Sequence, residues 1–85
     1  MESKVLIYST DYCPYCRAAK ALLLAKGVAF KEINVESDAA KRTWLVETTG
    51  QRTVPQIFIN GKSIGGFQEL SDLEQSGELD ALLSA

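Results

Sequence analysis

Histidine is absent from the 85-residue chain, and cysteine occurs only twice. Without histidine the chain cannot form the Cys-His and Ser-His pairs that activate nucleophiles in many hydrolases, nor a Cys2His2 zinc site. A structural zinc ion needs four protein ligands, and two cysteines cannot supply them within one chain. We therefore expect no metal site, and any nucleophile must be activated in a way that does not use histidine.

The chain also lacks a large excess of charge of either sign and any long apolar run. Nine Lys and Arg residues stand against eleven Asp and Glu residues, for a formal net charge of −2, which is too small to concentrate nucleic acid or an anionic membrane. No apolar run reaches the roughly 18 to 20 residues that cross a bilayer, and residues 1–4 lead into the first apolar segment without a small-residue cleavage site. Exported domains that depend on disulfides usually carry several dispersed cysteines. We therefore predict a soluble cytoplasmic protein, with neither nucleic acid nor a membrane as partner.

The order of predicted strands and helices indicates an α/β domain. At 85 residues, of which 46% are hydrophobic, the chain fits one domain over residues 1–85. Short β-branched runs predict strands, Ala- and Leu-rich or amphipathic segments predict helices, and Asn60-Gly61 is typical of a hairpin turn. The strands are expected over residues 4–8, 28–35 and 56–60, with a return strand that begins at Ser63-Ile64. The helices are expected over residues 14–26, 39–47, 67–75 and 78–85. A β-α-β unit followed by a hairpin predicts the order β-α-β-α-β-β-α and a four-stranded mixed sheet packed with helices.

The segment Cys13-Pro14-Tyr15-Cys16 carries the chemistry. Pro14 favours the first position of a helix, which makes Cys13 the N-cap residue, beside unpaired backbone N–H groups and the positive end of the helix dipole. Both stabilise a thiolate, so we expect the pKa of Cys13 to lie below the usual value of about 8.5. Cys16, one turn later, shares a helix face with Ala19 and is expected to be more buried. Cys13 is therefore the predicted attacking sulfur and Cys16 the resolving one.

The spacing of the pair also permits a disulfide. Side chains three residues apart on a helix lie about 5 to 6 Å apart, within reach of the separation that a disulfide needs, so the pair can be oxidised and reduced without unfolding. A static disulfide across so short a loop would restrict the unfolded chain little, which favours a redox role. Tyr12 and Tyr15 flank the pair, either as apolar walls for a bound disulfide or peptide or as half-exposed surface aromatics.

Three motifs make the chain resemble the dithiol glutaredoxins of the thioredoxin superfamily: CPYC at 13–16, RTVPQIFING at 52–61 and IGGFQEL at 64–70. The resemblance covers essentially the whole chain and implies a thioredoxin-like fold. It also implies glutathione-dependent reduction of protein disulfides and of protein–glutathione mixed disulfides, as part of electron transport and cell redox homeostasis. Glutathione would be a co-substrate, with no tightly bound cofactor. Disulfide-containing or glutathionylated proteins would be the partners of a monomer.

The resemblance further implies where glutathione binds. Pro55 would be cis and face the dithiol, although an X-Pro bond is cis only about 5% of the time in folded proteins. The backbone of Val54 would pair with the glutathione peptide. After Gly65-Gly66, the start of the next helix would bind the γ-glutamyl end, with Gln68 or Glu69 contacting its amino group.

The glycyl carboxylate of glutathione needs cations at the other end of such a site. Arg42 and Arg52 align with family positions that contact this carboxylate, a group that guanidinium binds in a bidentate manner. The complete set of implied glutathione contacts is Tyr15, Arg42, Arg52, Thr53, Val54, Pro55, Gly66, Phe67, Gln68 and Glu69.

One position departs from the family pattern. The family commonly has a lysine three residues before the first cysteine, where this chain has Thr10, followed by Asp11. A cation that would assist the thiolate is therefore missing, and an anion lies nearby. Either Arg17 and Arg52 compensate, or Cys13 depends more heavily on the helix terminus.

Two other functions are compatible with the same residues. In an iron-sulfur carrier, Cys13 and glutathione from two protomers would hold a [2Fe-2S] cluster, although the pair Pro14-Tyr15 is more typical of redox-active relatives. In a redox-sensing binding module of the same fold, the cysteines would report the redox state without turnover. Measuring turnover with glutathione would distinguish an oxidoreductase from both the iron-sulfur carrier and the redox-sensing module.

Overall fold

The computed structural model describes residues 4–84. Every predicted strand and helix occurs in the predicted order: β1 (Val5–Ser9), α1 (Pro14–Ala25), β2 (Lys31–Asn34), α2 (Ala39–Thr49), β3 (Gln56–Ile59), β4 (Lys62–Gly65), α3 (Phe67–Ser76) and α4 (Glu78–Leu83). Residues 1–3 of the predicted domain and Ala85, the end of the last predicted helix, lie outside the described residues. Of the helices in the described range, none has the length and apolar composition of a bilayer-spanning segment.

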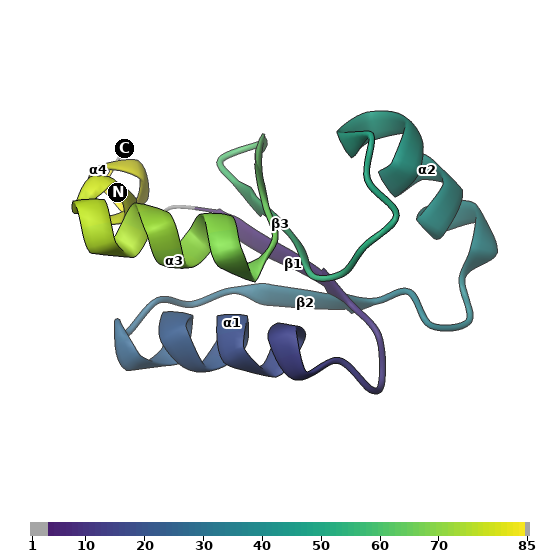
Figure 1. Cartoon of the computed structure of the whole chain (residues 1–85), viewed down its shortest axis with the longest axis horizontal. Coiled ribbons are helices and arrows are strands. Elements are labelled where there is room, and N and C mark those ends of the chain that lie inside the picture. The colour runs from purple at the N-terminus through teal and green to yellow at the C-terminus, as the bar shows by residue number, and fades with distance from the viewer. Residues whose placement is uncertain (1–3, 85) are drawn as a thin grey trace.

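The four strands form one mixed sheet, as predicted, and their order within it is β2-β1-β3-β4. β1 runs parallel to β2 and antiparallel to β3, and β3 and β4 are antiparallel. At the turn between β3 and β4, Asn60 and Gly61 have φ values of 53° and 83°, the left-handed backbone that a tight hairpin turn requires. In Figure 1, α1 and α3 run along the sheet close to each other, and α2 stands apart from both.

Alternation along the central strands produces two apolar clusters, one on each face of the sheet. Ile7 of β1 and Ile57 of β3 pack against α1, α3 and α4. The buried helical residues of this cluster are Ala19, Leu23, Leu70 and Leu79. The next residues along the strands, Tyr8 and Phe58, pack on the other face with Leu45 of α2. Both faces of the sheet are therefore covered, and the segments that follow β1 and precede β3 are attached to one rigid frame.

The strand predicted over residues 28–35 is shorter in the structure. Only Lys31–Asn34 forms β2, which pairs with residues 6–9 of β1. Val28 and Phe30 pack against the core without belonging to a strand. The prediction of a longer strand was wrong because an apolar pattern indicates burial, whereas the length of a strand depends on its pairing partner. The partner here, β1, is only five residues long.

Glu32 links β2 to its neighbours through side-chain hydrogen bonds. Lys20 Nζ and Ser9 Oγ both donate to Glu32 Oε2, over 2.8 and 2.6 Å. The bond from Lys20, and then that from Ser9, hold the pKa of Glu32 below its ordinary value of 4.5. A carboxyl group whose pKa is lower in the folded chain stabilises the fold above its unfolded pKa. That contribution is lost as the pH falls through the folded-state pKa.

We expect Glu32→Gln to lower the free energy of unfolding at pH 7 by less than about 1 kcal/mol, because the ion pair is partly exposed. The difference from wild type should shrink as the pH falls from 4.5 towards the folded-state pKa of Glu32. Urea unfolding across this pH range measures it. Glu47→Gln, which removes an exposed carboxylate that forms no ion pair within residues 4–84, is the matched control. A Glu32→Gln difference that stayed constant with pH would contradict the interpretation.

Candidate active site

The two cysteines lie at the start of α1. Cys13 is the N-cap residue, with extended backbone (φ −142°, ψ 96°), and Pro14 is the first helical residue. The N–H of Cys16 donates to Cys13 Sγ over 3.1 Å, the type of bond that an N-cap side chain accepts from the first helical turn. The predicted N-cap position of Cys13 is therefore confirmed, and its sulfur lies where the helix terminus favours negative charge.

The cysteines are joined in a disulfide, with their Cα atoms 5.1 Å apart. Cys16 is 1% exposed and Cys13 is 7% exposed, and Cys16 belongs to the same set of buried α1 residues as Ala19 and Leu23. The predicted difference in depth is therefore confirmed, and Cys13 is the more exposed of the two residues. Cys13 Sγ also lies 3.6 Å from the carbonyl oxygen of Val54, which puts it beside the chain that leads into β3.

A groove of about 290 Å³ adjoins this chain at Val54. Three segments that are distant in the sequence form it: the start of α1, the residues before β3 and the start of α3. The residues that line it are Tyr15, Thr53, Val54, Pro55, Gly66, Phe67, Gln68 and Glu69. All of them belong to the set that the resemblance implied, so the structure brings these residues together. The Val54–Pro55 peptide bond is cis, also as the resemblance implied.

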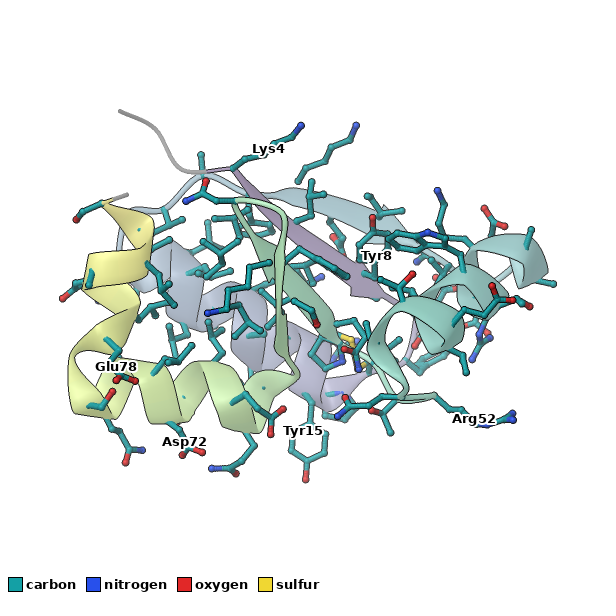
Figure 2. The ribbon with its side chains drawn as sticks, turned by 90° about the horizontal axis from the view of Figure 1, so that it is seen from above. Lys4, Tyr8, Tyr15, Arg52, Asp72 and Glu78 are labelled. Atoms are coloured by element: carbon teal, nitrogen blue, oxygen red, sulfur yellow. A yellow bond between two sulfur atoms is a disulfide. The ribbon has the colours of Figure 1, made fainter. Side chains whose placement is uncertain are left out.

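Tyr15 and Phe67 form the aromatic side of the groove. Their ring centroids are 6.3 Å apart and their planes differ by 30°. Figure 2 shows the side chain of Tyr15 projecting outward from α1. Tyr12, by contrast, is 92% exposed and is not among the residues that line the groove. Of the two tyrosines beside the cysteines, Tyr15 is therefore placed as an apolar wall, and Tyr12 is a surface aromatic.

Gly66 brings the start of α3 close to Pro55. It is the N-cap residue of α3, and a Cβ atom at this position would lie 3.3 Å from the Pro55 carbonyl oxygen, so a larger residue would press on the opposite wall of the groove. The first N–H groups of a helix, here those of Phe67 and Gln68, have no intrahelical partner. This end of the groove therefore offers backbone donors to an anionic group.

Gln68 and Glu69, which the sequence left as alternatives, differ in their present contacts. Glu69 Oε1 accepts from the N–H of Gly66 over 2.7 Å. Gln68 Nε2 donates to Asp72 Oδ1 over 3.0 Å, and Gln68 Oε1 accepts from no group within residues 4–84. Gln68 thus has an unused acceptor at the groove, whereas one oxygen of Glu69 is already engaged.

Arg42 of α2 and Arg52, which precedes β3, line a second hollow of about 220 Å³. Thr53 and Val54 line both hollows, so the second continues the first. Neither guanidinium group forms an ion pair with any residue from 4 to 84, and Figure 2 shows Arg52 projecting outward. The structure therefore brings the two predicted arginines together as unpaired cations.

The loop before Cys13 carries an anion and no cation. Asp11 Oδ1 accepts from Asn34 Nδ2 over 2.7 Å, and the N–H of Asp11 donates to Glu36 Oε1 over 3.2 Å. These bonds attach the loop to the end of β2. Thr10 adds no charge. The electrostatic support for a Cys13 thiolate that follows directly from the geometry is therefore the N-terminus of α1.

Gln56 also belongs to this region, although its role was not predicted from the sequence. It is the first residue of β3 and is fully buried. Its amide donates to Gln51 and Thr53, and so it holds the chain that forms one wall of the groove. The available signal was a polar residue at the start of an otherwise apolar strand, Gln-Ile-Phe-Ile.

The site is a dithiol at a helix terminus, next to a groove with aromatic, backbone and cationic contacts. No group of three or more His, Cys, Asp and Glu side chains in the described part of the chain could hold a metal ion. The arrangement suits thiol–disulfide exchange, in which a thiolate attacks a disulfide sulfur and a second thiolate leaves.

Comparison with known proteins agrees with this chemistry. The family model described as Glutaredoxin matches residues 5–64. Glutaredoxin 3 of Escherichia coli is 48% identical over 81 residues, which cover 95% of this chain and 98% of the relative. A glutaredoxin of Pseudomonas aeruginosa is 49% identical over 81 residues, which cover 95% and 96%. Among solved structures, a buckwheat glutaredoxin in complex with glutathione matches with a TM-score of 0.91 at 33% identity, over 96% of this chain and 77% of that one.

Proposed function

The chain belongs to the glutaredoxin family of thiol–disulfide oxidoreductases, and from this premise we propose that it uses glutathione to reduce protein disulfides and protein–glutathione mixed disulfides. The observation that carries the proposal is the position of Cys13, whose sulfur caps α1 and lies 3.6 Å from the Val54 carbonyl oxygen at the groove. A disulfide bound in the groove would meet the less buried of the two cysteines. Glutathione acts as a co-substrate and leaves after each cycle.

With a glutathionylated protein, only Cys13 is needed. The Cys13 thiolate attacks the glutathione sulfur, the mixed disulfide of the substrate breaks, and the substrate protein leaves as a thiolate that takes up a proton. A second glutathione, as thiolate, then attacks the sulfur of the glutathione bound to Cys13. Glutathione disulfide is released and the Cys13 thiolate is restored.

With a protein disulfide, both cysteines take part. Cys13 attacks one substrate sulfur and forms a mixed disulfide with the substrate, while the other substrate sulfur leaves as a thiolate. Cys16 then attacks Cys13, which releases the reduced substrate and forms the Cys13–Cys16 disulfide, the state in the structure. Two molecules of glutathione reduce this disulfide and become glutathione disulfide.

The residues that line the groove support an extended position for glutathione. The backbone of Val54 would pair with its cysteinyl residue, close to Cys13. The start of α3 would receive the γ-glutamyl carboxylate, and the unused Gln68 Oε1 would accept from the amino group. Arg42 and Arg52 would bind the glycyl carboxylate. The glutathione complex of the buckwheat relative supports this use of the fold.

Turnover of a small glutathione mixed disulfide, with glutathione present and glutathione disulfide measured through glutathione reductase, tests the proposal. Saturable turnover is the expected result. A brown protein that absorbs visible light after anaerobic purification, and that shows no turnover, would instead favour the iron-sulfur carrier. Redox-dependent binding of a partner protein without turnover would favour the sensing module.

Arg42→Met and Arg52→Met are each expected to raise the KM for the glutathione mixed disulfide by about two- to fivefold, because an exposed charge pair contributes up to about 1 kcal/mol. Added salt should shrink both effects, since it screens exposed charges, and kcat should change less than KM. Lys31→Met removes the same charge from an exposed, unpaired position on β2 and should leave KM unchanged. If the KM were unchanged in a variant that carries both substitutions, Arg42 and Arg52 would not belong to the glutathione-binding site.

We also propose that residues 1–85 act as a single monomeric domain in a reducing compartment such as the cytoplasm. The two cysteines of the chain are three residues apart and belong to one site, which leaves none for structural disulfides. Light scattering on the reduced protein tests the monomer.

A further inference from the structure

The side chain of Gln56 lies in the interior, and its hydrogen bonds go to the chain that precedes β3. It is fully buried, and its Nε2 donates to Gln51 Oε1 over 3.0 Å and to the Thr53 carbonyl oxygen over 2.8 Å. Thr53 Oγ1 lies farther from the same nitrogen, at 3.4 Å. Because a backbone carbonyl can only accept, the NH2 side of the amide must face Thr53.

The bond to Thr53 determines the direction of the next peptide group. The Thr53–Val54 peptide is trans, because Val54–Pro55 is the one cis bond within residues 4–84. In a trans peptide the C=O and N–H groups point in opposite directions. Since the Thr53 carbonyl points inward to the buried Gln56, the Val54 N–H points outward, where Thr53 and Val54 line the groove. No residue of the described range accepts from this N–H.

Packing alone does not account for glutamine at this position. Gln56 Oε1 is buried and has no hydrogen-bond partner among residues 4–84, which costs stability that an apolar side chain of similar size would not lose. The other described residues of β3 are apolar. The bonds that its NH2 group makes to Gln51 and Thr53 are what a glutamine provides here and an apolar side chain would not.

We propose that Gln56 is a positioning residue for substrate binding, which turns the Val54 N–H into the groove so that it can donate to the peptide of glutathione. The inference rests on the proposed function and adds a residue that does not itself touch the substrate. By holding Gln51 and Thr53, Gln56 also restricts Arg52 between them. The Val54 N–H and Arg52 are thereby held at a fixed distance from Cys13.

Two variants at position 56 test the proposal through their pH dependence. In Gln56→Glu a protonated carboxyl can still donate to the Thr53 carbonyl, whereas a carboxylate would face acceptors and release the loop. A buried carboxyl group titrates above its usual pKa of about 4.3, so the change falls within an assayable range. Gln56→Met has a similar volume and no donor at any pH.

We expect the KM for the glutathione mixed disulfide to be close to wild type in Gln56→Glu at low pH and to rise about tenfold as the carboxyl group ionises, the loss expected for one buried hydrogen bond. In Gln56→Met the KM should be raised about tenfold at every pH. Each value is divided by that of wild type in the same buffer, which removes the titration of Cys13. In both variants kcat and the rate of Cys13 alkylation by iodoacetamide should change by less than about threefold, because α1 and its N-cap do not depend on Gln56.

Gln75→Glu is the matched control, because it makes the same chemical change at an exposed glutamine of α3 outside the groove; it should leave the pH profile of KM as in wild type. A KM that is unchanged in both variants at position 56, while wild type turns over, would overturn the positioning role alone. An absence of turnover in wild type would instead overturn the proposed function.

Hydrogen exchange in the wild-type protein tests the same inference even if a variant fails to fold. The side-chain NH2 protons of Gln56 should exchange at least about tenfold more slowly than those of Gln75. The backbone N–H of Val54 should exchange rapidly in the free reduced protein and become protected when Cys13 of the Cys16→Ser variant carries glutathione. Rapid exchange of the Gln56 amide, or a Val54 N–H that is protected without glutathione, would overturn the proposal.

Discussion

Cys13→Ser is expected to reduce the turnover of a glutathione mixed disulfide to the uncatalysed rate. Exchange requires a sulfur nucleophile, and a serine hydroxyl becomes reactive only beside a general base. The chain has no histidine to serve as that base. Cys16 cannot substitute for Cys13, because it is 1% exposed. The expected effect is therefore the largest of any single substitution in this protein.

Serine at position 13 also provides a structural control. It is among the best N-cap residues, so α1 should form as in the wild type and the melting temperature should match that of the reduced wild-type protein. The loss of turnover would then be chemical. A Cys13→Ser protein that kept more than a few per cent of wild-type turnover would show that another group attacks the substrate.

Cys16→Ser is expected to separate the two reactions. Turnover of the glutathione mixed disulfide should stay within a few-fold of wild type, because that cycle uses only Cys13. Reduction of a protein disulfide should fall by at least about tenfold at the same glutathione concentration. The reason is that an intramolecular thiol has a far higher effective concentration than a free one. Parallel assays with the two substrates measure the ratio.

Cys16→Ala controls for the cost of burying a hydroxyl group. Cys16 shares its buried helix face with Ala19 and Leu23, where a serine hydroxyl without a partner would destabilise α1. Alanine avoids that cost, so the same separation of activities in both variants would assign the effect to the missing sulfur. Equal loss of both activities would contradict the resolving role of Cys16.

Cys13 and Pro55 differ in how far their surroundings in the chain determine their conformation. The N-cap position of Cys13 could be predicted because it depends on the adjacent Pro14 and on backbone groups within one helical turn. The cis bond before Pro55 could not be predicted in this way, since local preference favours trans. It followed from the resemblance to the glutaredoxins.

The residues that line the groove were likewise not predictable from local patterns. Tyr15, Val54 and Phe67 are far apart in the sequence, and the resemblance grouped them, whereas spacing and periodicity alone could not. The contacts of Gln56 escaped both approaches. A glutamine at the start of a strand does not reveal whether its amide faces solvent or, as here, a loop carbonyl.

The order of strands and helices, the N-cap position of Cys13 and the turn at Asn60 and Gly61 could all be predicted from the residues, because each depends on interactions among residues a few positions apart. Two other features could be read only from the folded structure: β2 spans only Lys31–Asn34, and Gln56 donates to the Thr53 carbonyl of the peptide before Val54. Those outcomes depend on pairing and packing between segments distant along the chain. Such contacts form only when the whole sheet and its helices assemble, so no local pattern encodes them.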